Sequence, residues 1–135
     1  MIVFEHTKHK ALWNRVAEIL REKPNKWLSD IKIQAFNELF PDETMPIKTC
    51  YACEYDEEIC DMFTEENMPV ICENCPLIWP GWHTSCEENY DDSGNLEFGL
   101  HAELMYAISG NRWDDAVKLA EQIRDLPIKN DVETV

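Results

Sequence analysis

Apolar residues recur at helical spacing in the first third of the chain. Over residues 7–23 they share one face of a helix, and Pro24 interrupts the pattern. A weaker repeat of apolar positions covers residues 26–40 and stops at Pro41. We therefore expect residues 1–48 to be helical and to contain two helices.

The strongest helical pattern lies near the C-terminus. Apolar residues from Leu96 to Ile108 fall on one helical face, and Ser109-Gly110 ends the pattern. A second apolar series covers residues 116–126, and Asn111 stands where a side-chain cap for its first turn is expected. Residues 96–127 are therefore predicted to form a helical hairpin.

Between these helical parts the chain has no sustained periodicity of either kind. Residues 41–95 contain five prolines, two glycines and all six cysteines. A stretch of this length without regular structure is uncommon in a compact domain unless something else organises it. Because 135 residues bury one core, we expect a single, mainly α-helical domain over 1–135, whose irregular middle segment, 49–95, is held together by a metal ion.

The cysteines of the middle segment include two matched pairs. Cys50-x2-Cys53 and Cys72-x2-Cys75 are separated by 18 residues. Zn²⁺ prefers four thiolate or imidazole ligands at tetrahedral corners, and two tight turns can each supply two of them. We therefore predict that these four cysteines bind Zn²⁺ in a zinc-ribbon-like site. A closed shell of four thiolates has no open position for substrate, so the site is expected to be structural.

The ligand set itself stays open. Three further side chains are near enough in sequence to replace one of the four cysteines, namely Cys86, Cys60 and His83. A second ion is compatible with the same residues. Neither pair has the strand–helix setting of a thioredoxin-like dithiol, and His101-x-Glu103 follows both pairs, whereas zinc deaminases place that motif first. No catalytic residue is predicted.

Charge is distributed unevenly along the chain. The formal net charge is −15, yet residues 1–48 are nearly neutral, while residues 49–111 contain 14 acidic and no basic side chains. Phosphate contacts need Lys and Arg, so direct nucleic-acid binding through this segment is not expected. An acidic surface suits a protein partner whose own surface is basic. The competing interpretation, that the acids only keep the protein soluble, stays open.

Two acidic clusters and one short tryptophan loop are the predicted contact residues for such a partner. They are Asp56, Glu57, Glu58, Glu65, Glu66, Trp79 and Trp82. The N-terminus lacks the apolar core of a secretory signal, and no run approaches the ~18 apolar residues of a membrane span. We therefore expect a cytoplasmic protein with reduced thiols and no membrane contact.

The motifs CYACEY and CENCPLIW, with Cys86 after them, resemble a group of small uncharacterised proteins encoded by tailed bacteriophages. The shared pattern is Cys-x-Ala-Cys-Glu-Tyr, then Cys-x-x-Cys-Pro-Leu-x-Trp, then another cysteine, and it covers residues 50–86. The resemblance implies a metal-binding accessory protein in the host cytoplasm and carries no known reaction. Cys60 has no counterpart in the pattern.

Together these features predict a small acidic zinc-binding phage-type accessory protein. Its expected role is to bind and modulate, by inhibition, a host protein with a basic surface. Charge mimicry makes a nucleic-acid-binding or defence protein the favoured target class. Two alternatives stay open, a metal-dependent enzyme of unknown reaction and a structural or assembly partner. The oligomeric state and the identity of the target are also left open.

Overall fold

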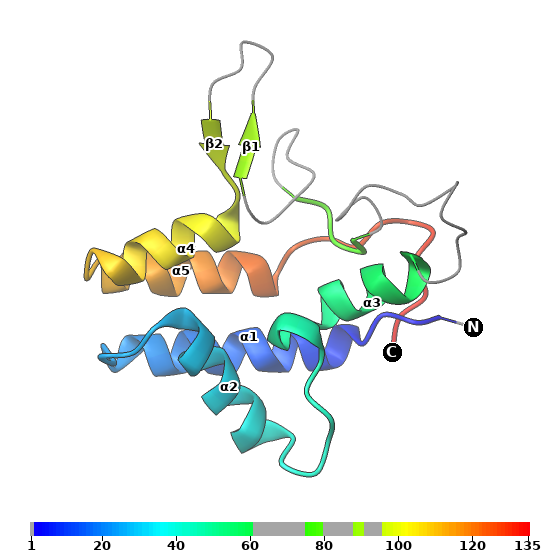
Figure 1. Cartoon of the computed structure of the whole chain (residues 1–135), viewed down its shortest axis with the longest axis horizontal. Coiled ribbons are helices and arrows are strands. Elements are labelled where there is room, and N and C mark those ends of the chain that lie inside the picture. The colour runs from blue at the N-terminus through cyan, green and yellow to red at the C-terminus, as the bar shows by residue number, and fades with distance from the viewer. Residues whose placement is uncertain (1, 61–74, 80–87, 91–95) are drawn as a thin grey trace.

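A computed structural model describes residues 2–60, 75–79, 88–90 and 96–135 of the chain. The described part is mainly α-helical, with N-terminal helices and a C-terminal helical pair, as the apolar periodicity predicted (Figure 1). The elements are α1 (His6–Arg21), α2 (Leu28–Leu39), the 3₁₀-helix η1 (Ile47–Thr49), α3 (Tyr51–Cys60), β1 (Glu88–Tyr90), β2 (Leu96–Phe98), α4 (Leu100–Ser109) and α5 (Trp113–Arg124).

The first helix, α1, is the centre of the fold. Figure 1 shows α4 and α5 on one side of α1 and α2 on the other. The buried residues of α1 recur every three or four positions, which gives the helix a wide apolar face. They are His9, Leu12, Trp13, Val16, Ala17, Ile19 and Leu20. The first and last helices of the chain thereby share one hydrophobic core.

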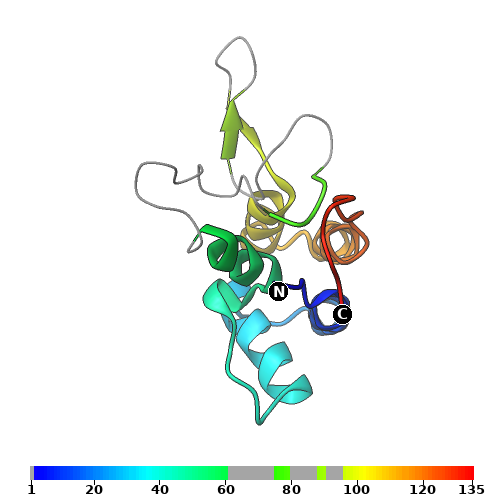
Figure 2. The same cartoon turned by 90° about the vertical axis from the view of Figure 1, so that its right-hand side faces the viewer.

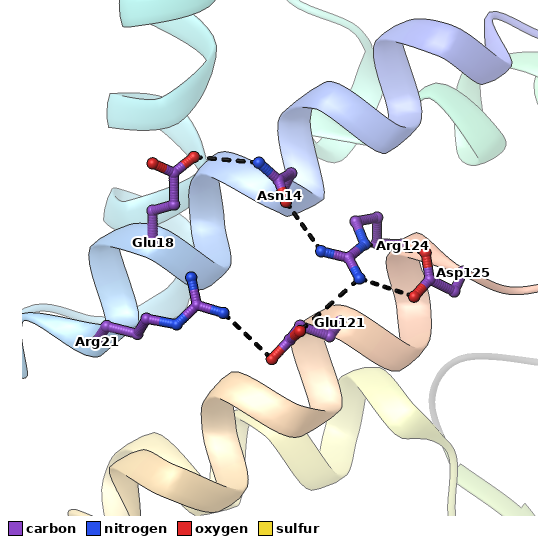
Figure 3. Close-up of polar contacts among 6 residues, drawn as sticks. All are labelled: Asn14, Glu18, Arg21, Glu121, Arg124 and Asp125. Atoms are coloured by element: carbon purple, nitrogen blue, oxygen red, sulfur yellow. Dashed lines mark hydrogen bonds and ion pairs between the residues drawn. The ribbon is translucent and has the colours of Figure 1, made fainter.

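Polar side chains join α1 to α5 along the solvent edge of this contact (Figure 3). Arg124 Nη1 donates to Asn14 Oδ1 at 2.8 Å, and Arg21 Nη2 lies 3.4 Å from Glu121 Oε1. Asp125 lies 2.8 Å from the same Arg124 guanidinium. Exposed pairs of this kind contribute about 0–1 kcal/mol each. They therefore orient the helices, while burial of apolar surface supplies most of the stability.

The buried face of α2 contains a lysine. Leu28, Ile31, Ala35 and Phe36 are buried at helical spacing, and Lys32 lies among them with 5 % of its surface exposed. A charged side chain is rarely buried to this extent without a partner. Its position on this stripe brings it close to η1 and α4, where its contacts are described below.

The C-terminal hairpin differs from its prediction at both helix ends. Leu96 lies in β2, which pairs antiparallel with β1, and α4 begins only at Leu100 after an extended Gly99. Asn111 does not cap α5. Its φ of 56° is left-handed, and its N–H donates to Ile108 O while the Arg112 N–H donates to Ala107 O. These two bonds form a Schellman motif that ends α4, a role that Asn tolerates because its side chain is short and polar.

The middle segment was predicted to be irregular, yet residues 51–60 form α3. Tyr51, Ala52 and Asp56 are buried along one side of this helix. The pattern was missed because only ten residues carry it and four of them are acidic. Residues 61–74 lie outside the described part of the chain, so the prediction for them is not addressed.

Two strand-like contacts close the fold. Phe4 pairs in parallel with Thr134, and Figure 2 shows the red C-terminal segment reaching the dark-blue start of the chain. Leu77 pairs antiparallel with Ile128, supported by the Ile78 N–H bond to Pro127 O at 2.8 Å. Residues 75–79 are thereby fixed beside the end of α5. Among the described residues, no helix combines the length and apolar character needed to cross a membrane.

Candidate metal centre

The first Cys-x-x-Cys pair lies where the chain enters α3. Cys50 directly precedes the helix and Cys53 lies in its first turn. The backbone N–H of Cys53 donates to Cys50 Sγ at 3.4 Å. A hydrogen bond from the Cys53 side chain, together with the charge of Lys32, outweighs burial and lowers the pKa of Cys50 to about 6. The lowered pKa favours the thiolate form of Cys50, which is the form that binds metal.

Cys75 joins this pair from a distant part of the sequence. Its side chain is 7 % exposed, and the pairing of residues 75–79 with residues 127–129 holds it in place. Cys50, Cys53 and Cys75 line the same cavity of about 30 Å³. Two of the four predicted ligands from the first motif and one from the second are therefore brought to one place.

Two histidines and a carboxylate line the same cavity. They are His9 from α1, His101 from α4 and Asp56 from α3. His9 Nε2 lies 3.1 Å from Ile123 O, and burial lowers the pKa of His9 to about 4. Burial, together with the charges of Lys32 and Lys48, lowers the pKa of His101 to about 4 as well. Both imidazoles are therefore neutral at pH 7, as a metal ligand must be.

Buried polar atoms at this cavity provide a further test of the metal prediction. His9 Nδ1 and Trp79 Nε1 are buried and have no hydrogen-bond partner among the described residues. An indole N–H is a donor that suits a thiolate sulfur, and a second shell of donors is typical of metal–thiolate sites. The donor set of thiols and imidazoles fits Zn²⁺. Among the described residues, however, no three such side chains are close enough together to hold an ion.

The remaining predicted ligands fall where the structure does not describe side chains. Cys72, Cys86 and His83 lie outside the described residues, and for Cys60 only the backbone at the end of α3 is described. The metal and its complete ligand set therefore stay predictions. His9 and His101 were not among the predicted ligands. His9 falls on the apolar face of α1, and a polar residue inside an apolar stripe is the signal that points to it.

The buried ammonium group of Lys32 is close enough to act on the charge of Cys50. Lys32 Nζ donates to Lys48 O at 2.8 Å, lies 3.5 Å from His101 Nε2 and is 5.6 Å from the centroid of the Trp13 ring. Its charge favours the thiolate form of Cys50. Because a shell of four thiolates around Zn²⁺ carries two net negative charges, a cation here would stabilise the predicted zinc site.

The predicted partner-binding residues that the structure describes separate into two groups. Glu57 and Glu58 are exposed on α3, whereas Asp56 and Trp79 are each 8 % exposed and line the thiol cavity instead. Asp56 is four residues after the buried Ala52 and therefore lies on the same inward face of the helix. Glu57 and Glu58, which follow it, face water. Glu65, Glu66 and Trp82 lie outside the described residues.

Known proteins offer no guide to this site. No family model, no curated protein and no solved structure matches the chain. The function of the site is therefore inferred from its residues alone.

Proposed function

We propose that the chain is a small zinc-binding accessory protein whose metal centre holds an acidic surface in place for a basic protein partner. One observation carries the proposal. Thiols from α3 and from residues 75–79 line a single cavity, and one of them has its pKa lowered to about 6. An ion bound there joins two parts of the chain that are far apart in sequence.

The metal would act as a staple for α3. This helix has ten residues; it packs against α1 and η1, and its tyrosines contact Phe4 and Phe40. Isolated helices shorter than about 12 residues are marginal in water, so α3 depends on its surroundings. Ligands in its first turn supply the missing constraint. A closed thiolate shell leaves no position for a substrate, which favours a structural role over catalysis.

The stapled helix presents acids to solvent. Glu57 and Glu58 are exposed, and no Lys or Arg occurs from residue 49 to residue 111. Like-signed charges on one surface attract an oppositely charged partner and speed encounter. The resemblance of the two cysteine motifs to phage proteins supports a host protein as that partner, bound in the host cytoplasm and inhibited by mimicry of nucleic-acid charge.

Metal analysis tests the proposal. We expect about one zinc ion per chain after dialysis against metal-free buffer, measured by elemental analysis. Cys75→Ser and Cys72→Ser should lose the ion and part of the helical circular dichroism, because structural zinc sites contribute roughly 10–16 kcal/mol to folding in small peptides. Cys60→Ser is the matched control and should keep both. Loss of zinc in Cys60→Ser would place that residue in the ligand set.

A dithiol redox pair is the second candidate, because Cys50 precedes a helix and has its pKa lowered to about 6. The two candidates differ in a direct measurement. A folded, metal-free protein in which Cys50 and Cys53 form a disulfide would favour the redox pair. Zinc bound under reducing conditions, with no change in fold on mild oxidation, would favour the staple.

A further inference from the structure

A second cavity lies on the other side of His101 from the thiols. It has a volume of about 560 Å³ and lies between the start of α2, η1 and α4. The residues that line it include Trp27, Lys32, Lys48, His101, Met105 and Tyr106. Small-molecule sites have volumes of about 300–1,000 Å³, so the cavity is of a size to enclose a small ligand.

The lining is cationic on an otherwise acidic protein. Among the described lining residues there are two lysines and no carboxylate, although the chain has a formal net charge of −15. Lys8 and Arg15 each pair with a glutamate, whereas no described carboxylate pairs with Lys32 or Lys48. Lys32 also acts on the Cys50 thiol, whereas the exposed Lys48 has no described carboxylate partner, so the lining still favours a negative group over a neutral one.

The Lys32 ammonium is built into this wall. It is 95 % buried. One N–H donates to Lys48 O at 2.8 Å, and a second is within 3.5 Å of His101 Nε2. An ammonium group has three N–H donors, so one is left for a further acceptor. His101 is neutral at pH 7, because burial and the two lysines lower its pKa to about 4. It therefore adds no positive charge of its own, and the charge of the lining comes from the two lysines.

Aromatic side chains surround the mouth of the cavity. Trp27 is 67 % exposed, Tyr106 is 53 % exposed and Met105 is 46 % exposed. Large apolar side chains gathered around one cavity mark a binding surface more often than scattered ones do. Trp27 also stands at the start of α2, which has no side-chain cap, so the positive end of the helix faces the same region.

From these contacts we propose that the cavity binds a small aromatic anion. A flat ring packs against Trp27 and Tyr106, and a carboxylate or phosphate group is bound by Lys32 and Lys48. The lysines determine the charge of the ligand, and the aromatic rim determines its shape. This site is separate from the proposed partner surface and does not depend on it.

Titration of the full chain with matched probes tests the site. Nuclear magnetic resonance would follow the backbone amides of residues 28–32 and the Trp27 indole N–H. The probes are 1-naphthoate, 1-naphthyl phosphate, neutral 1-naphthamide and inorganic phosphate. We expect saturable shifts with at least one aromatic anion, and the stronger of the two identifies the preferred acid group. Binding of the amide and of inorganic phosphate should be about tenfold weaker or more.

Variants locate the ligand. Lys48→Gln removes an exposed charge but keeps the backbone carbonyl that Lys32 contacts, and Trp27→Ala removes the exposed ring. Each should weaken binding about tenfold, whereas Lys118→Gln on α5 should not change it. Equal affinity for the neutral amide, no saturable shift with either anion, or full affinity in both Lys48→Gln and Trp27→Ala would overturn the proposal.

Discussion

His9 shows how one residue connects burial, tautomer and stability. It lies in the apolar face of α1, and its Nε2 atom is 3.1 Å from Ile123 O on α5. A carbonyl only accepts, so Nε2 carries the proton and Nδ1 does not. Burial lowers the pKa of His9 to about 4. The folded protein therefore holds a neutral ring, and charging that ring opposes folding.

Acid is expected to destabilise the protein through this histidine. Between its ordinary pKa of 6.5 and the folded pKa of about 4, the unfolded chain binds a proton that the folded chain does not. Stability therefore falls as pH decreases through that window, by up to about 3 kcal/mol when complete. The measurement is the free energy of urea unfolding at about pH 7.5 and about pH 4.5.

The His9→Gln variant isolates this contribution. Glutamine keeps an N–H donor for Ile123 O but does not titrate. Because acid would also protonate the thiols and release any metal that they bind, the quantity of interest is the difference between the two proteins. We expect the variant to lose less stability than the wild type over the same pH range. An equal loss in both would show that His9 is not the group that titrates.

At the scale of elements, apolar periodicity predicted four of the helices and missed α3, β1 and β2. The repeat in α1 is long and reports its buried face directly. Leu96 continues the apolar spacing of α4, yet the extended Gly99 and pairing with β1 place it in a strand. Strands of three residues each are too short to show a period of two in the sequence.

The sequence indicated which kinds of residue form the candidate site, but it did not indicate all of its members. The spacing of the cysteine pairs predicted that Cys50, Cys53 and Cys75 share one site, and these three line one cavity, while the metal itself stays a prediction. That His9 and His101 line the same cavity depends on the packing of α5 against α1 and of α4 against α5, which no local pattern encodes. The same holds for Lys32. Its position within the apolar face of α2 can be predicted from the sequence, but its contacts cannot.

The end of α4 provides a test of element-level interpretation. Asn111 has a left-handed φ of 56° and takes part in a Schellman motif. Asn111→Gly should be neutral or stabilise by about 0.5 kcal/mol, whereas Asn111→Ser should cost about 1 kcal/mol. An N-cap would give the reverse order, because serine caps as well as asparagine. Urea unfolding of the two variants distinguishes the roles.

At the scale of the whole molecule, positive and negative charges are distributed unevenly between regions. Arg15 Nε lies 2.6 Å from Glu38, and Lys8 Nζ lies 2.8 Å from Glu43, so bases of α1 pair with acids of the α2 region. The acids of residues 49–111 have no Lys or Arg within their own segment. Opposite charges are thus combined near the helical core, and the excess negative charge is concentrated in the segment that contains the cysteines.

Partner binding is therefore expected to be sensitive to salt. Affinity should fall as NaCl rises from ~50 to ~500 mM, because screening shortens to a few ångströms. Replacing Glu57 and Glu58 together by glutamine should slow association more than it speeds dissociation, as surface plasmon resonance would measure. Asp56 is left unchanged because it is buried.

The control for this experiment is a second exposed acidic pair. Asp114→Asn with Asp115→Asn, at the start of α5, removes the same charge from a different element. It should alter association less than the α3 variant does, and both should keep their zinc. Equal effects from the two pairs would show that only net charge matters. Binding that does not depend on salt would leave the acidic surface without a role.

The pairing of the first helix with the last has a consequence for how the protein is made. Leu12, Val16 and Leu20 pack in a core that α5 completes, and α5 ends at Arg124. A ribosome adds about 5–20 residues per second, so α1 waits roughly 5–20 s for that partner. Throughout this time only the elements made before α5, mainly α2 and α3, can cover part of its apolar face. The nascent chain, rather than the finished protein, is therefore the form most in need of a chaperone.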